Sequence, residues 1–115
     1  MAIKKFIATK DNTITNGFGL DISTRKTGSN MGASDILEVY SVFGQQTTSS
    51  AELSRVLVEF PVSTIKADRA AGTVPVSGSV NFFLRMFNAR HSEQLPRDFT
   101  FNIMAISQSW QEGTG

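Results

Sequence analysis

Three stretches of the chain alternate apolar and polar residues with a period of two, the pattern of a β-strand with one buried face. The clearest is 55–60, where Val56, Val58 and Phe60 fall on one face and Arg55 and Glu59 on the other. The second, 79–88, also places Phe83 and Phe87 on its opposite face, so we expect it to be covered on both sides. The third is 98–107. The predicted core consists of Val56, Val58, Phe60, Val80, Phe82, Leu84, Phe99, Phe101 and Ile103.

The rest of the chain reads as shorter strands, loops and one helical segment. Further strands are predicted at 4–9, 12–15 and 36–43. Loops rich in Gly, Ser, Thr and Asn lie between the strands, and 16–34 is the longest of them. Residues 63–72 have a helical pattern, with Ser63 placed to cap its start and Gly72 to stop it. Many short strands joined by turns predict an all-β fold, an antiparallel β-sandwich or jelly roll with one short helical turn, in a single domain over residues 1–115.

Charge and hydropathy exclude several classes of partner. With 11 Lys and Arg against 10 Asp and Glu, the net charge of +1 gives no electrostatic footprint for a nucleic acid. No apolar run approaches the roughly 20 residues of a membrane-spanning helix, and the N-terminus lacks the apolar core of a signal peptide. We therefore expect a soluble protein that contacts neither nucleic acid nor membrane. A chain of this length is expected to bury roughly two thirds of its unfolded surface.

The residues needed for common catalytic and zinc sites are scarce. The chain has one histidine, His91, no cysteine and no Gly-x-Ser-x-Gly motif, so neither a triad nor a zinc site is indicated. Glu38 and Glu59 lie in predicted strands and are the alternative, an acid pair of the kind used in glycoside hydrolysis. We expect no catalytic residues, and the chain is predicted not to be an enzyme.

Oxygen ligands for calcium are more plentiful than ligands for zinc. Hard cations take carboxylate and amide oxygens, and several such residues lie in or beside the loops. The candidates are Asp11, Asn12, Asp21, Asn30 and Asp35. They do not follow the spacing of a helix-loop-helix calcium loop, and turn formation is the alternative explanation for them. No cofactor is expected, with calcium as the one alternative.

Aromatic side chains are the usual means by which a β-sandwich binds sugars, because a flat ring stacks on the apolar face of a pyranose. The candidate glycan-binding residues are Tyr40, Phe18 and Trp110. A structural role is the alternative for each, since Tyr40 alternates with core positions and Trp110 follows a predicted strand.

Five blocks in order along the chain resemble a known family. The blocks are Asn30-Met31-Gly32, Leu37-Glu38-Val39, residues 54–65 beginning Ser-Arg-Val-Leu, residues 80–86, and residues 109–114 reading Ser-Trp-Gln-Glu-Gly-Thr. Over about residues 11–115 they resemble the disaggregatase-related jelly-roll domains, which are non-catalytic β-sandwiches found as carbohydrate-binding-like modules and in cell-surface and phage structural proteins. The resemblance implies structural roles for these positions. Arg55 is expected to pair with Glu38 or Glu112, and Trp110 to cap the core.

The chain departs from the family pattern in two places. The fourth block reads Val80-Asn81-Phe82-Phe83-Leu84, which is bulkier than the family's Ala-x-Leu-x-Leu. The family also continues through at least one more strand after the position of Gly115. We therefore expect a fragment, a domain incomplete at its C-terminus, or a strand supplied by a neighbour, because an open sheet edge leaves backbone groups unpaired.

Residues 27–39 and 84–89 also resemble structural proteins of tailed phages. This resemblance implies a non-enzymatic structural or decorating protein of the virion, a capsid, tail or fibre component, made in the host cytoplasm. Its expected partners are other virion proteins, as a homo-oligomer or through strand sharing, with glycans as a further option. The alternative is an extracellular carbohydrate-binding module of a larger secreted or surface protein.

Overall fold

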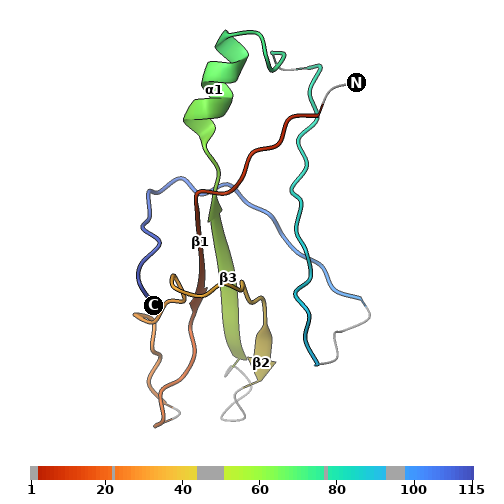
Figure 1. Cartoon of the computed structure of the whole chain (residues 1–115). Coiled ribbons are helices and arrows are strands. Elements are labelled where there is room, and N and C mark those ends of the chain that lie inside the picture. The colour runs from red at the N-terminus through yellow and green to blue at the C-terminus, as the bar shows by residue number, and fades with distance from the viewer. Residues whose placement is uncertain (1–2, 22, 44–50, 77, 93–97) are drawn as a thin grey trace.

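A computed structural model of the chain describes residues 3–21, 23–43, 51–76, 78–92 and 98–115 (Figure 1). Its regular structure in these residues is predominantly β. The elements are β1 (Lys10–Thr15), β2 (Ser41–Phe43), β3 (Ala51–Glu59) and α1 (Val62–Ala70). The strands form one antiparallel sheet in the order β1-β3-β2.

The long pairing of β1 with β3 sets which residues share a face of the sheet. Its register runs from Lys10 opposite Glu59 to Thr15 opposite Ser54. Because side chains alternate along a strand, Ile14 and Arg55 lie on one face. Thr13 and its partner Val56 lie on the other face. The strands predicted at 12–15 and 55–60 are confirmed, and both begin earlier than the alternation indicated.

The strand predicted at 36–43 is confirmed only over its last three residues. In the residues just before them, a serine side chain forms hydrogen bonds in place of a backbone ladder. Ser54 Oγ accepts from Tyr40 N at 2.7 Å and donates to Glu38 O at 2.8 Å. Serine competes with a β-ladder in this way because its hydroxyl both donates and accepts. The predicted strand at 4–9 is wrong, since only Thr9 N extends the pairing, donating to Glu59 O at 2.8 Å.

The predicted helix is present, but its start differs from the expectation. Pro61 occupies the N-cap position and Ser63 lies within the first turn, where it makes no capping bond. Gly72 has the expected role, because its φ of +78° suits glycine and its N–H donates to Arg69 O at 3.2 Å. Figure 1 shows α1 standing beyond the end of β3, so the helix does not cover the faces of the sheet.

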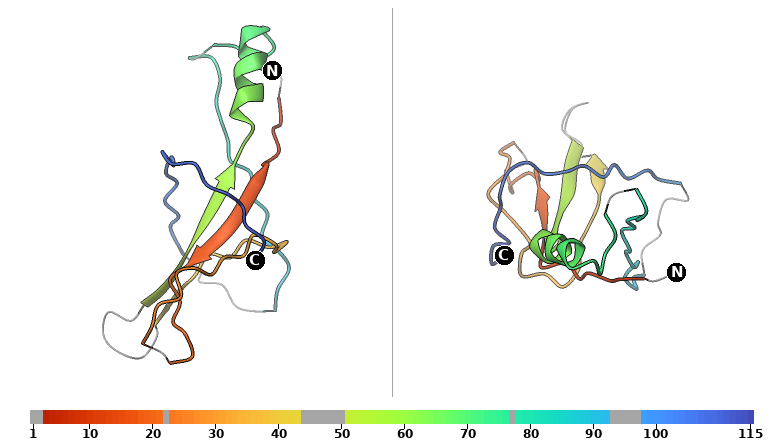
Figure 2. Two further views of the ribbon diagram at one scale, coloured as in Figure 1. Left: turned by 90° about the vertical axis from the view of Figure 1, so that its left-hand side faces the viewer. Right: turned by 90° about the horizontal axis from the view of Figure 1, so that it is seen from above.

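The strands predicted at 79–88 and 98–107 are wrong, because neither stretch joins a β-ladder in the described residues. Both run as extended chain, the first beside the sheet and the second toward the C-terminus (Figures 1 and 2). We call residues 80–87 and 99–106 the apolar arms. The predicted core is wrong for the same reason. Five of its members are 42% to 73% exposed: Phe82, Leu84, Phe99, Phe101 and Ile103.

The core of the described residues is small. Val56, Val58, Phe60 and Val80 are half-buried, and the buried residues are Val74, Asn12 and Thr13. The accessible surface of 10114 Å² corresponds to burial of about 44% of the surface of an unfolded chain of this mass. The expectation of two thirds is therefore wrong, because the apolar arms form no second layer over the sheet.

Candidate functional site

A group of side-chain-to-backbone hydrogen bonds joins β1 and the turn 30–32 to residues 110–115. The Asn12 side chain donates to Glu112 O at 2.6 Å and accepts from Met31 N at 2.9 Å. The Glu112 carboxylate accepts from Asp11 N at 3.1 Å. We call Asn12, Asn30, Glu112 and the turn 30–32 the polar clasp. Asn12 is 3% exposed, so its bonds form away from bulk water, where losing one leaves a polar group unsatisfied.

Asn30 holds the second half of the polar clasp. Its Oδ1 accepts from Gly32 N at 3.0 Å, an Asx turn, and from Gly115 N at 3.2 Å. Gly32 lies directly against the backbone carbonyl of Glu112, in space that a Cβ atom would occupy. Gly113 has a φ of +80° beside the Asn30 side chain. Both glycines are therefore required by geometry, one by a close approach and one by its backbone conformation.

The polar clasp also covers the outer edge of the sheet at β1. Met31 N donates to Thr13 O at 3.2 Å, and Ile14 forms a single antiparallel bridge with Asn30. Thr13 is fully buried, and its Oγ1 accepts from Glu38 N at 3.1 Å. An edge strand that is capped in this way does not present a free row of backbone groups.

Two of the candidate calcium ligands, Asn12 and Asn30, belong to the polar clasp, and a third, Asp11, contacts it through its backbone N–H. The side-chain oxygens of Asn12 and Asn30 are used there as acceptors for backbone N–H groups. Asp21 lies elsewhere, where its carboxylate accepts from Thr24 and from Ser23 N. Asp35 is exposed. No group of three or more His, Cys, Asp or Glu side chains that could hold a metal ion occurs in the described parts of the chain, and calcium binding stays a prediction.

Thr24 sets the ionisation of Asp21. The Thr24 hydroxyl donates to Asp21 Oδ2 at 2.5 Å, and backbone N–H groups of Thr24 and Ser23 donate to Oδ1. These bonds favour the charged carboxylate and lower the pKa of Asp21 below its ordinary value of 3.8. Asp21 is exposed, and its carboxylate stabilises the loop by accepting hydrogen bonds from Ser23 and Thr24.

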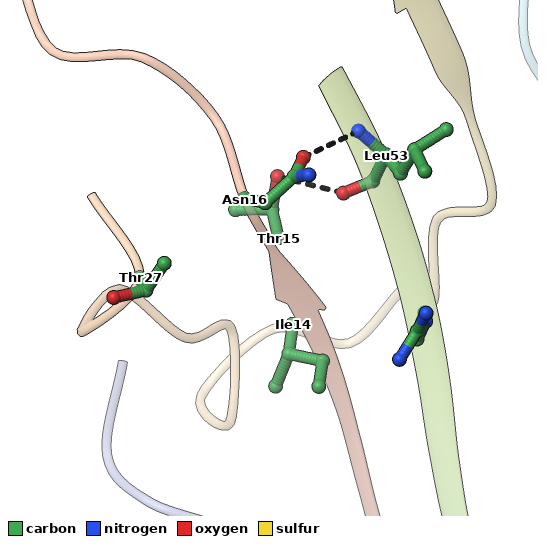
Figure 3. Close-up of a pocket in the computed structure, with 6 residues that line it drawn as sticks. Ile14, Thr15, Asn16, Thr27 and Leu53 are labelled. Carbon is green, nitrogen blue, oxygen red and sulfur yellow. Dashed lines mark hydrogen bonds between the residues drawn. The ribbon is translucent and has the colours of Figure 1, made fainter. Parts of the chain in front are cut away.

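A cavity of about 330 Å³ opens between β1, β3 and the long loop. It is lined by Ile14, Thr15, Asn16, Thr27, Leu53 and Arg55. Figure 3 shows Thr27 on the loop side of β1 and Leu53 on the β3 side. Asn16 fixes the junction, since its Oδ1 accepts from Leu53 N at 2.6 Å. This volume is at the lower end of the range for small-molecule sites.

Arg55 supplies the charged wall of the cavity. The expectation that it pairs with Glu38 or Glu112 is wrong, because the ion pairs in the described residues are Lys4–Asp68 at 3.3 Å and Lys10–Glu59 at 3.4 Å. Glu112 instead caps the backbone of Asp11. Arg55 lies opposite the apolar Ile14 in the β1–β3 register, and this pairing leaves its guanidinium at the cavity wall. A guanidinium beside an apolar surface suits a carboxylate or another planar anion.

The structure does not gather the three candidate aromatic residues into one platform. Tyr40 OH bonds Thr15 Oγ1 at 2.5 Å, at the end of β1. Phe18 lies under the guanidinium of Arg25, 3.8 Å from its ring centroid. Trp110 lies at the start of β1, where its ring is 5.8 Å from Lys10 Nζ and its carbonyl accepts from the same amine at 3.4 Å. Each ring has a local structural contact, and glycan binding by these residues stays a prediction.

The three residues considered for acid–base chemistry are Glu38, Glu59 and His91, and each lies in a different environment. Glu59 bonds Lys10, and the backbone N–H of Glu38 donates to Thr13 on the opposite face of the sheet. No contact joins the two acids, which were the alternative for a catalytic pair, in the described residues. His91 is exposed at the end of the first extended stretch. None of the three lines the cavity.

Two residues that organise the long loop were not indicated by any sequence pattern. Arg25 Nη1 donates to Asn16 O at 2.9 Å and to Ala51 O at 3.0 Å while its guanidinium covers Phe18. Glu52 accepts from Phe18 N at 2.6 Å. Alternation along a strand predicts which side chains share a face, but it carries no information on a loop that folds back onto the strand.

The first and last blocks of the family resemblance meet in the polar clasp, where Asn30-Met31-Gly32 contacts the Glu-Gly turn at 112–113. The two blocks are 80 residues apart in sequence, so their contact is a tertiary one. Among the described residues, no helix combines the length and apolar character needed to cross a membrane. No protein-family model, curated protein or solved structure matches the chain.

Proposed function

We propose that the chain is a non-enzymatic structural or decorating component of a phage particle, whose full fold is an antiparallel β-sandwich of jelly-roll type completed on assembly. The observation that carries the proposal is the exposure of the apolar arms. Phe83 and Phe87 are 87% and 80% exposed, and Met104 is 83% exposed. Large contiguous apolar surface marks a site that another protein covers.

The bonding of the candidate site supports a structural role. The polar clasp uses its side-chain oxygens to hold backbone N–H groups, as Asn12 and Asn30 do. The glutamates weighed as a catalytic pair are held apart, and Glu59 is bonded to Lys10. Such an arrangement fixes a scaffold and presents loops to partners.

Sedimentation of particles tests the proposal. Lysate from the native source is separated on a density gradient, and the polypeptide is located by mass spectrometry. We expect recovery with intact particles at a fixed ratio to the major particle protein. Washing the particles at high salt controls for adsorption of a free protein. Recovery in the soluble fraction alone contradicts the proposal.

A carbohydrate-binding module of a larger protein is the second candidate, and the cavity favours it. Its apolar wall, hydroxyl groups and Arg55 guanidinium match an acidic sugar, which offers a carboxylate and an apolar ring face. A glycan array with and without calcium tests this function. Binding of uronic-acid glycans that is lost in Arg55→Ala and kept in Lys66→Ala supports it, and a blank array in both conditions excludes it.

A further inference from the structure

The apolar arms are nearly free of charge. Residues 80–87 and 99–106 contain one ionisable side chain, Arg85, and its guanidinium lies over Phe87 at 4.8 Å from the ring centroid. In the second arm, the rings of Phe99 and Phe101 meet edge to face at 4.9 Å. These two contacts lie within each arm and leave most of the apolar surface accessible. The arms therefore carry no charge pattern that would select a partner of opposite charge.

The area left exposed is the size of a subunit interface. A folded monomer of 12.5 kDa has an accessible surface of about 6,200 Å², whereas this chain has 10114 Å². The radius of gyration is 18.0 Å, against about 13 Å for a compact domain of this length. If each of two chains buried half of its excess, the interface would total about 4,000 Å², within the range of obligate homodimers.

The backbone N–H and C=O groups of the arms also need hydrogen-bond partners. Both arms are extended, and neither belongs to a ladder in the described part of the chain. Extended segments are stabilised by pairing with other strands, which satisfies their N–H and C=O groups. The outer edge of β1 is already covered by the polar clasp. In the described residues the arms pair with no strand of this sheet, so their backbone groups are open to strands of another chain.

We propose that these strands come from a second copy of this chain, so that the arms of two copies pair with and cover each other. A second copy brings the same uncharged, alternating surface and the same excess area, which a charged or small partner does not. The net charge of +1 opposes this association only weakly. The inference rests on the proposed assembly role and names the first partner in it.

Sedimentation equilibrium of the 115-residue chain over a range of concentrations measures the association. We expect a dimer or a larger closed oligomer at micromolar concentration. Phe83→Glu places a charge in the centre of the first arm, and we expect it to weaken association by about 30-fold or more. Leu20→Glu is the matched control, because Leu20 is fully exposed outside the arms, and we expect no change. A wild-type monomer throughout this range overturns the inference.

Hydrogen exchange separates association from a failure of the variant to fold. In the wild type we expect the amides of the arms to gain protection as concentration rises, while those of β1 and β3 are protected at all concentrations. If Phe83→Glu keeps the protection of β1 and β3 and loses only that of the arms, the inference is supported. Arms protected equally at every concentration would mean that the chain covers them itself, which overturns the inference.

The outcomes also separate this inference from the proposed function. A chain that is monomeric in solution yet sediments with particles at a fixed ratio retains the particle role and loses the self-association. A chain that associates with itself but is never recovered with particles retains the self-association and loses the particle role.

Discussion

The side chain of Asn12 donates to the backbone carbonyl of Glu112 at 2.6 Å, joining β1 to a segment one hundred residues later in the chain. The same side chain accepts from Met31 N, so one amide satisfies groups from two separate segments. Asn12 thus connects the sheet edge, the 30–32 turn and the C-terminal turn through bonds made in a buried position.

Replacing Asn12 with alanine is expected to lower the free energy of unfolding by about 1–3 kcal/mol, because it removes the donor to the Glu112 carbonyl and leaves the Met31 N–H with its longer bond to the Thr13 carbonyl. Urea unfolding followed by circular dichroism measures the change. Asn88→Ala is the control, since Asn88 is exposed. Equal stability of the two variants would show that water replaces both bonds at no cost.

Gly32→Ala is expected to destabilise the protein by about 1–3 kcal/mol, because its Cβ atom would overlap the Glu112 carbonyl and force the C-terminal turn away from Asn30. Gly28→Ala is the matched control, as a Cβ there meets no atom within 4 Å. Thermal unfolding compares the two. Amide exchange at Gly115, whose N–H bonds Asn30, shows whether the turn has detached. Unchanged exchange in Gly32→Ala would contradict the prediction.

The sequence predicted the sheet correctly where a segment with alternating apolar residues pairs with another strand of the same chain. In β3, Val56 and Val58 share one face and are half-buried, whereas Arg55 on the other face is exposed, and the partner strand β1 supplies the opposing positions. The arms alternate just as clearly, yet Phe82 and Ile103 are exposed. Alternation of apolar and polar residues indicates that one face of a strand is covered, but it does not indicate whether the same chain or another chain covers that face.

The candidate site was less predictable because its bonds run between side chains and distant backbone groups. Asn30 was identified as an oxygen ligand, and its oxygen is used to accept from Gly32 and Gly115. The pairing of Arg55 with Glu38 or Glu112 was expected from its place on the polar face of a strand, and Glu112 instead bonds the backbone of Asp11. A pattern of residue types does not show where backbone N–H groups lie, yet these groups compete with arginine and lysine side chains for the same carboxylates.

Arg25→Ala is expected to loosen the long loop at its contact with β3. The substitution removes the cover over Phe18 and the bonds to the carbonyls of Asn16 and Ala51, at a cost of about 1–3 kcal/mol. Arg25→Lys keeps the charge and loses the planar group, so we expect an intermediate loss. Chemical unfolding measures each variant. Lys5→Ala, at an exposed position, is expected to leave stability unchanged.

Thr24→Val is expected to raise the pKa of Asp21 toward 3.8, because the threonine hydroxyl is the largest cause that lowers it. A carboxylate with a lowered pKa stabilises the folded state above its unfolded pKa, and this contribution is lost as pH falls through the lower folded value. Titration of the Asp21 carboxyl carbon by NMR measures the shift. Thr73→Val is the control, and an equal pKa in both variants would contradict the assignment.

The bonds of the polar clasp can form only in a fixed order during synthesis of the chain. β1 is synthesised early, but Glu112 leaves the ribosome about 5–20 s later at ordinary translation rates. During that interval Asp11 N and the Asn12 side chain lack their partner groups on Glu112, although β3 becomes available about halfway through it. Contacts of such long sequence separation form slowly. The nascent chain therefore carries an unfinished strand edge until Glu112 has been synthesised, and neighbouring nascent chains compete with its own turn at 112–113 to close it.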